Sequence, residues 1–509
     1  MFVDRRVLQA AAVSALCLIG AAGTAFAQTS APAARVLTLD EALSLAEKSS
    51  ERVAVATAGV ARAEGGMLLA RSERMPQLFG AVSYDRTLKS EFEGLFDADP
   101  ADPVEPGGGG DVDFSNLPFG QANVYRVGLA FSQVIYAGGR IKAQEAQAAI
   151  RRDSARLNLS SASAQNTLDV AEAYFDAGLT DWLVSIAEAT HAQADRSLKV
   201  ATDQHAAGRQ SEFELLRARV ARDSLVPSVV RARNARDVAY LRLKQLLDLP
   251  LDLPLRLTAD LDGAALPPPP RFAEALASAE SSAQAPERLA VTQVGNEVKV
   301  AEQAIAIARS ERKPSVNLRS DYGLVDYPGS VPNFTDWRQN WTVGVGLSLP
   351  IFDGGRIKAN EAIARAGADE ARATLRLSQE LDALDRASTR SDLSAALSEW
   401  EAAASTIQQA ERAYTIAELR FNEGLSTQLE LSDARLQLAQ SQVTRAEAAR
   451  NLQVRRIRFA LLPALPLAAA SASQVQAQAS GGGTVQAPRP QASTQTAAPA
   501  GAAGISGGR

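Results

Sequence analysis

The chain has 509 residues, a formal net charge of −5 and a hydrophobic content of 46%, of which aromatic residues are few at 5%. Such a composition is typical of a large protein rich in helices built on alanine and leucine, and no basic stripe indicates nucleic-acid binding. Two histidines (His191, His205) and one cysteine (Cys17) provide no Cys/His metal cluster and no thiol nucleophile, so we expect no catalytic residue, no metal and no cofactor.

The first 27 residues have the features of an export signal. Two arginines precede an apolar run over residues 7–22, and an A-x-A cleavage site ends at Ala27. A lone transmembrane anchor is the alternative, but the run is short and no other stretch of about 20 apolar residues follows. We therefore expect residues 1–27 to be removed, residues 28–37 to form a polar lead, and any membrane contact to be made by strands.

Two helical segments with matching ends are predicted in residues 38–74 and 271–313. The first closes with RSERMP at 71–76 and the second with RSERKP at 309–314. Proline disfavours helix at the residue before it, so both helices should end there.

After each proline the hydrophobic period changes from 3.6 to 2, which predicts one β-hairpin in residues 77–137 and another in 315–352. In the second hairpin Val343, Val345 and Leu347 alternate with small or polar residues. One face is apolar and the other is small or polar, as in strands that stand between lipid and water.

Aromatic residues near the strand ends favour a membrane barrel over a soluble β-sandwich, which alternates in the same way. Bands of aromatic residues at both membrane interfaces are typical of lipid-embedded barrels. The predicted rims are Tyr84, Tyr125, Tyr322, Trp337 and Trp341 on one side, and Tyr136 and Phe352 on the other. The loops between the strands, 91–120 and 327–339, are predicted to lie outside, and the first is acidic, glycine-rich and mobile.

Four strands cannot close a wall alone. About eight strands are needed for even the narrowest barrel, and lipid does not tolerate unpaired strand edges. Copies of the chain must therefore pool their strands. The residues themselves leave open whether two or three copies do so.

The hairpins end in nearly identical phrases, YAGGRIKA at 136–143 and FDGGRIKA at 352–359. Each phrase ends a strand pattern and begins a long stretch without proline, which predicts a turn from strand to helix. The predicted strand–helix hinge residues are Gly138, Gly139, Gly354 and Gly355.

Long helical hairpins are predicted after the hinges, in residues 139–249 and 355–465. Each outgoing helix would be on the order of 100 Å long at ~1.5 Å per residue, and each turns back at a glycine, Gly208 or Gly424. Pro227 should bend the first returning helix. A proline-rich linker, 251–270, joins the halves, and residues 467–509 have the composition of a disordered tail.

The two phrases stand 216 residues apart, and the same offset relates Gly208 to Gly424, which indicates an internal duplication of 38–250 and 271–466. Over residues 38–466 the chain resembles the TolC family of bacterial outer-membrane efflux proteins, whose halves each carry such a phrase before a long helix. The resemblance implies a mainly α fold with a membrane β-barrel part: a trimeric channel-tunnel with a shared 12-strand barrel and a long α-helical coiled-coil barrel.

The resemblance further implies an outer-membrane exit duct for a tripartite efflux or type I secretion system, with its helical part in the periplasm. Its implied partners are a homotrimer, outer-membrane lipid, a periplasmic membrane-fusion adaptor and an inner-membrane pump of RND or ABC type. A periplasmic coiled-coil adaptor or scaffold is the alternative, but it would leave the four amphipathic strands without a purpose.

By the family's pattern, residues around the second tip narrow the periplasmic mouth of the tunnel. Matching by the turn glycine assigns Phe421, Ser426, Glu430 and Asp433 to this gate, and Glu214 on the first returning helix more weakly. Glu430 and Asp433 are three residues apart and share a helix face, so three copies would bring six carboxylates to one axis and favour cations. An ordinary solvated face is the alternative. Ser426 stands where the family often has arginine, so a locking salt bridge is not expected.

The turns themselves form the docking surface that the resemblance implies for an adaptor hairpin. Its predicted residues are Gly208, Gly424, Leu425 and Ser426.

Overall fold

The computed structural model of the chain describes residues 35–89, 123–259, 261, 263, 265–281, 287–327 and 337–467. The predicted signal peptide, the acidic loop and all but the first residue of the predicted tail lie outside the described residues. That first residue, Leu467, is 4% exposed, so packed structure continues at least to this position.

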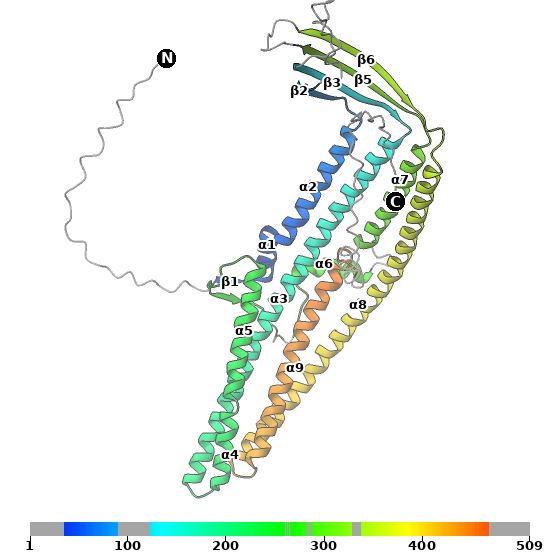
Figure 1. Cartoon of the computed structure of the whole chain (residues 1–509). Coiled ribbons are helices and arrows are strands. Elements are labelled where there is room, and N and C mark those ends of the chain that lie inside the picture. Colours follow the sequence, from blue (N-terminus) through cyan, green and yellow to red (C-terminus); the bar gives the residue numbers. More distant parts are fainter. Residues whose placement is uncertain are drawn as a thin grey trace, which may run out of the picture. The chain divides into compact units, whose positions relative to one another are not determined.

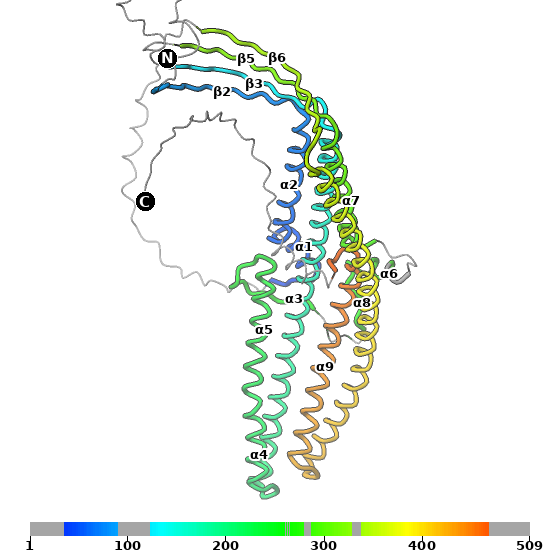
Figure 2. The backbone as a smooth tube through the Cα atoms, turned by 45° about the vertical axis from the view of Figure 1, so that its right-hand side comes forward, coloured from blue at the N-terminus to red at the C-terminus, as the bar shows by residue number. Residues whose placement is uncertain are grey.

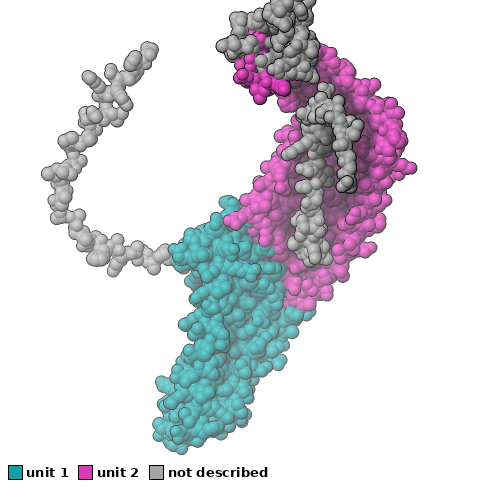
Figure 3. Space-filling view, viewed as in Figure 1, with its two compact units in different colours: residues 1–50, 169–267, 398–454 teal, residues 51–168, 268–397, 455–509 magenta. Residues whose placement is uncertain are grey.

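The chain divides into two compact units (Figure 3). Unit 1 comprises residues 1–50, 169–267 and 398–454, and unit 2 comprises residues 51–168, 268–397 and 455–509. Three helices contribute residues to both units: α3 (Arg140–Ala206), α8 (Arg356–Asn422) and α9 (Gln428–Leu461).

Unit 2 contains a four-stranded antiparallel sheet in the order β2-β3-β5-β6 (Figure 1). The strands are β2 (Gln77–Arg86), β3 (Asn123–Ala137), β5 (Ser315–Asp326) and β6 (Arg338–Ser348). They lie side by side and curve in the same direction (Figure 2). Among the described strands β2 and β6 are the edges, so each presents backbone groups that no neighbouring strand pairs.

The strand register sorts the side chains onto two different faces. Tyr322 pairs with Leu129 on one side and with Trp341 on the other, so these three side chains share a face. The apolar face includes Val82, Tyr84, Tyr125, Val127, Leu129, Phe131, Leu318, Tyr322, Leu324, Trp341, Val343, Val345 and Leu347. The small-residue face includes Ala81, Ser83, Gly128, Ala130, Ser132, Gly323, Thr342, Gly344 and Gly346. Large apolar side chains of the first face are exposed, as in a sheet that meets lipid.

Both strand-to-helix turns have the same backbone conformation. The φ angles are +65° and +96° at Gly138 and Gly139, and +65° and +90° at Gly354 and Gly355. Only glycine adopts this region without strain, which explains the repeated pair.

The second turn carries an additional helix cap. The Asp353 carboxylate accepts hydrogen bonds from the Ile357 amide at 2.8 Å and from the Gly355 amide at 3.0 Å. These bonds favour the charged form and lower the pKa of Asp353. The first turn has Ala137 at the corresponding position, so this cap belongs to α8 alone.

The remaining helices of unit 2 are α2 (Glu51–Ser72), α6 (Pro270–Ser281) and α7 (Leu289–Ser310). Among the described helices α2 alone is long and apolar enough to cross a membrane by length and composition, contrary to the expectation of no second apolar stretch. Glu64 within it pairs with Arg156 of α3 at 2.9 Å. Charges are costly in lipid, so we assign α2 to the helices that lie in water.

Arg288 fastens three segments of unit 2 together. Its side chain is 1% exposed, and its guanidinium donates to the carbonyls of Leu465 and Pro466 at 3.0 and 2.8 Å. It also pairs with Asp385 at 2.6 Å and Asp382 at 3.4 Å, both on α8. Every group around this buried charge is therefore satisfied.

Unit 1 is built from helices and one short strand pair. It contains α1 (Leu39–Ser49), α4 (Glu212–Asp223), α5 (Val226–Leu246) and parts of α3, α8 and α9, with β1 (Arg35–Leu37) parallel to β4 (Leu255–Leu257). α3 and α8 have 67 residues each, which corresponds to about 100 Å. The first returning helix is interrupted between α4 and α5, where the bend at Pro227 was expected, because proline starts a new helix more readily than it continues one.

Candidate functional site

Two helical turns of unit 1 carry the predicted docking residues and adjoin the predicted gate residues on α4, α8 and α9. The first, at 207–211, joins α3 to α4, and the second, at 423–427, joins α8 to α9. Gly208 and Gly424 have left-handed φ angles of +69° and +73°. No other part of the described chain lies within 4 Å of the space that a side chain at either glycine would take, so both turns are open.

The two turns also share one hydrogen-bond pattern. The Arg209 amide donates to the Gln204 carbonyl and the Leu425 amide to the Arg420 carbonyl, both at 2.8 Å. Bonds of this kind end helices at a glycine and satisfy the last carbonyls. The tips are therefore matching pieces of structure.

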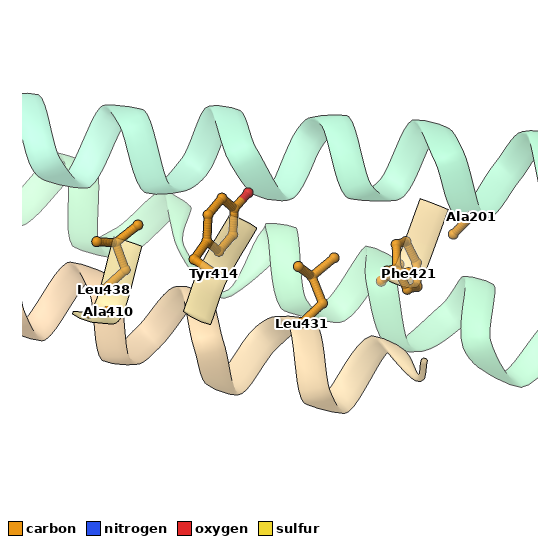
Figure 4. Packing of buried hydrophobic residues seen from close by; sticks show 7 residues of the cluster. Ala201, Ala410, Tyr414, Phe421, Leu431 and Leu438 are labelled. Atoms are coloured by element: carbon orange, nitrogen blue, oxygen red, sulfur yellow. The ribbon is translucent and has the colours of Figure 1, made fainter. Parts of the chain in front are cut away.

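Phe421 lies inside the tip (Figure 4). Its side chain is 0% exposed in a cluster formed with Ala201, Ala218, Ala410, Tyr414, Leu431 and Leu438. It therefore fills the core between helices of this chain, contrary to the prediction that it narrows a channel mouth. Burying an aromatic ring stabilises the packing more than exposing it to a water-filled pore would.

Glu214 ties the two turns together. Its Oε2 accepts a hydrogen bond from the Gln428 amide at 3.3 Å, and its Oε1 lies 3.5 Å from Arg217 Nη1. The carboxylate thus serves the first turn of α9 instead of standing free in a ring of charges, as the weaker gate assignment expected.

Glu430 and Asp433 are both exposed on one face of α9. Among the described residues neither carboxylate takes part in an ion pair. Both charges are therefore available to a neighbouring molecule, to another copy of the chain or to passing ions.

A polar stripe continues from these two acids along α9, and the sequence reasoning missed it. The stripe consists of Glu430, Asp433, Gln437, Gln440, Thr444 and Glu447, all exposed and spaced alternately by three and four residues. Its C-terminal part, from Gln437 to Glu447, lines a groove of about 420 Å³ together with Glu399 and Thr406 of α8. Polar residues at heptad spacing are visible in the sequence, so the period of polar positions would have revealed the stripe.

The remaining docking residues differ in exposure. Leu425 is 71% exposed at the very turn. Ser426 is half-buried, and its hydroxyl has no hydrogen-bond partner in the described part of the chain. The second turn thus offers an apolar side chain beside an unsatisfied polar one.

A buried charge lies within the tip core, and sequence reasoning did not identify it. Arg435 is buried with Nη2 3.3 Å from Ser432 Oγ, and no carboxylate of the described residues pairs with it. Burial lowers the pKa of Arg435 and raises the pKa of Tyr414 to about 12, and the Tyr414 hydroxyl donates to Glu418 at 2.9 Å. A buried unpaired charge costs free energy, so the packing of the tip is weaker than its apolar cluster suggests.

Comparison with known proteins gives a consistent result over most of the chain. The family model "Outer membrane efflux protein" matches residues 42–248 and 282–465. The solvent efflux pump outer membrane protein SrpC of Pseudomonas putida is 24% identical over 385 residues, which cover 73% of each chain.

Solved structures agree at the level of the fold. The CmeC outer membrane channel of Campylobacter jejuni superimposes with a TM-score of 0.66 at 15% identity, covering 86% of this chain and 88% of that one. The outer membrane protein VceC of Vibrio cholerae gives a TM-score of 0.64 at 19% identity, covering 83% and 95%.

Proposed function

The chain belongs to the family of outer membrane efflux proteins, and on this premise we propose that three copies of it assemble into one channel-tunnel. As a member of this family it is an exit duct of the bacterial outer membrane, with its helical part in the periplasm. It conducts passively, and the energy for transport comes from the pump that it serves.

The single observation that carries the assembly of several copies is the sheet. Its apolar face is exposed, and its two edges are unpaired within the described chain. Four strands are too few to close, since about eight are needed for the narrowest barrel, so copies must combine their strands. Three copies, the number that the resemblance to the TolC family implies, supply twelve. A periplasmic adaptor would have no use for such a sheet.

In the proposed assembly the polar stripe of α9 faces the channel axis. Glu430 and Asp433 of three copies would then form two rings of charge at the periplasmic mouth, which attract cations and repel one another. The buried and unpaired Arg435 of α9 supports a tip that opens at modest cost. Phe421 and Glu214 hold the helices of each copy and take no part in the rings.

The partners in this proposal are an adaptor and an inner-membrane pump of RND or ABC type. The adaptor would bind at the turns, where Gly208 and Gly424 leave the surface open and Leu425 offers an exposed apolar side chain. SrpC is named for a solvent efflux pump, which supports export of small molecules over secreted proteins for this chain as well.

Ion selectivity in planar bilayers tests the gate. The purified wild-type protein should conduct with a preference for cations, and Glu430→Gln combined with Asp433→Asn should reduce that preference several-fold. Glu401→Gln combined with Glu411→Gln removes two exposed carboxylates of α8 as a matched control and should leave it unchanged. Equal selectivity in all three proteins would contradict the gate assignment. A wild-type protein that forms no channel would contradict the proposed role as an exit duct.

A further inference from the structure

The two hairpins of the sheet are superimposable in register as well as in sequence. Gln77 pairs with Ser132 in the first hairpin, and Ser315 pairs with Ser348 in the second. Tyr84 stacks on Tyr125 with 4.6 Å between the ring centroids. The corresponding Tyr322 packs edge-on against Trp341 with 6.4 Å between the ring centroids. One offset, 216, relates β3 to β6 (Gly138 to Gly354), and another, 238, relates β2 to β5 (Pro76 to Pro314).

The seam between the hairpins is the pairing of β3 with β5. In it Leu129 lies opposite Tyr322, and Ser132 lies opposite Arg319. By the offsets, β6 is the counterpart of β3, and β2 is the counterpart of β5. These are the two strands whose outer edges are unpaired in the described chain.

From this correspondence we infer that β6 of one copy pairs with β2 of the next in the register of the internal seam. Val345 then lies opposite Tyr84 of the partner subunit, and Ser348 lies opposite Ala81 of the partner subunit. The inference rests on the proposed trimer and adds to it the residues that meet.

The chemistry of the faces supports this register. Leu347 and Val345 of the apolar face meet the partner's Val82 and the partner's Tyr84, which belong to the same face. A shift by one residue would place these apolar side chains opposite the small-residue face. The register thus continues both faces from one copy to the next.

The glycine hinges supply an independent observation. A side-chain carbon at Gly138 would lie 2.6 Å from the Ser310 carbonyl oxygen and 2.8 Å from Lys313 Cβ, so the end of α7 seats directly on this glycine. Gly354 has the same φ of +65°, yet nothing lies within 4 Å of the equivalent point.

By the offset of 238, one segment of the chain corresponds to the end of α7 and would fit the open space beside Gly354. The counterpart of Ser310 is Ser72, and the counterpart of Lys313 is Met75, whose side chain is 57% exposed. The end of α2 from the next copy, with Ser72 of the partner subunit, therefore covers Gly354 in the assembly. Ile351 and Phe352 beside this hinge are 95% and 92% exposed in the single chain, as expected for residues next to an interface.

Disulfide formation between introduced cysteines tests the register. The only natural cysteine lies in the predicted signal peptide, so the mature full-length protein offers a clean background. Ala81→Cys with Ser348→Cys should link copies into covalent dimers and trimers that reductant dissolves. Ala81→Cys with Gly346→Cys, on the same face two residues away, is the control and should link far less.

The outcomes separate the register from the proposed function. Intact trimers that link through Gly346→Cys, or through neither pair, overturn the register alone. Failure to recover any trimer from the wild-type outer membrane would overturn the proposed function on which the register depends.

The contact between Gly354 and the partner's Ser72 is tested by a second pair of variants. Gly354→Ala and Gly208→Ala place alanine at nearly equal left-handed φ angles, +65° and +69°, so both incur similar strain within one chain. Only Gly354→Ala adds a carbon against the partner's Ser72, so its trimer should dissociate at a lower temperature on gels than the Gly208→Ala trimer. Equal dissociation temperatures would show that the end of α2 from the next copy does not contact Gly354.

Discussion

Arg288 shows at the scale of one residue how unit 2 is fastened. Replacing it by alanine removes the donor of two buried carbonyls and the closest partner of Asp385, whereas Asp382 keeps its ion pair with Arg386. Breaking one side of a buried pair costs about 3–5 kcal/mol, so Arg288→Ala should lower the unfolding free energy by an amount in that range.

An exposed arginine provides the control for this prediction. Arg372→Ala removes ion pairs with Glu302 and Asp369, and it should cost less than about 1 kcal/mol because water replaces them. Chemical denaturation of both variants in detergent measures the difference. Equal losses would show that the Arg288 network does not stabilise the unit.

Asp353 makes the stability of the second hinge depend on pH. Hydrogen bonds from Ile357 and Gly355 lower its folded pKa below the unfolded value, so its contribution is present above the unfolded pKa and lost as the pH falls through the folded one. Asp353→Ala, which copies the natural Ala137 turn, should reduce the melting temperature near pH 7 and reduce it much less near about pH 3. A constant difference across this range would contradict the cap.

Residue roles at the tip were only partly accessible from the sequence. The exposure of Glu430 and Asp433 follows from a spacing that any reader can see, and the turn glycines follow from helix-ending chemistry. The burial of Phe421 and the bond from Gln428 to Glu214 depend on which helices meet, and local pattern does not contain that information. The unpaired Arg435 is unexpected for the same reason, since arginine on a helix is normally solvated.

At the scale of elements, the two faces of the sheet make opposite predictions. Val343→Lys places a charge on the apolar face, where lipid contact would cost about 2–4 kcal/mol near the bilayer midplane. Thr342→Lys places the same charge on the neighbouring small-residue face, where water accepts it. Only the first variant should reduce the yield of heat-modifiable oligomers in outer-membrane fractions. Equal yields would contradict the assignment of the faces.

The strands and the long helices were the elements that the sequence predicted best, because alternating apolar residues and runs without proline determine secondary structure locally. The break at Ser224 and Leu225 lies where a bend at Pro227 was predicted. Both residues keep right-handed helical angles, and Pro227 stands in the first turn of α5, where proline is tolerated. The membrane-like composition of α2 is resolved only by its ion pair with α3, a contact between segments far apart in the sequence.

At the scale of the whole molecule, membership of the outer membrane efflux protein family follows from phrases that the chain contains twice, and the match to 42–248 and 282–465 agrees with them. The number of copies does not follow from one chain. It depends on how many four-stranded sheets close one β-barrel, which is a property of the assembly.

The molar mass of the mature protein extracted from outer membranes tests this central claim most directly. Light scattering on the protein in detergent, with the detergent contribution subtracted, should give three chains per particle. A mature protein that is monomeric and stays dissolved without detergent would contradict the account.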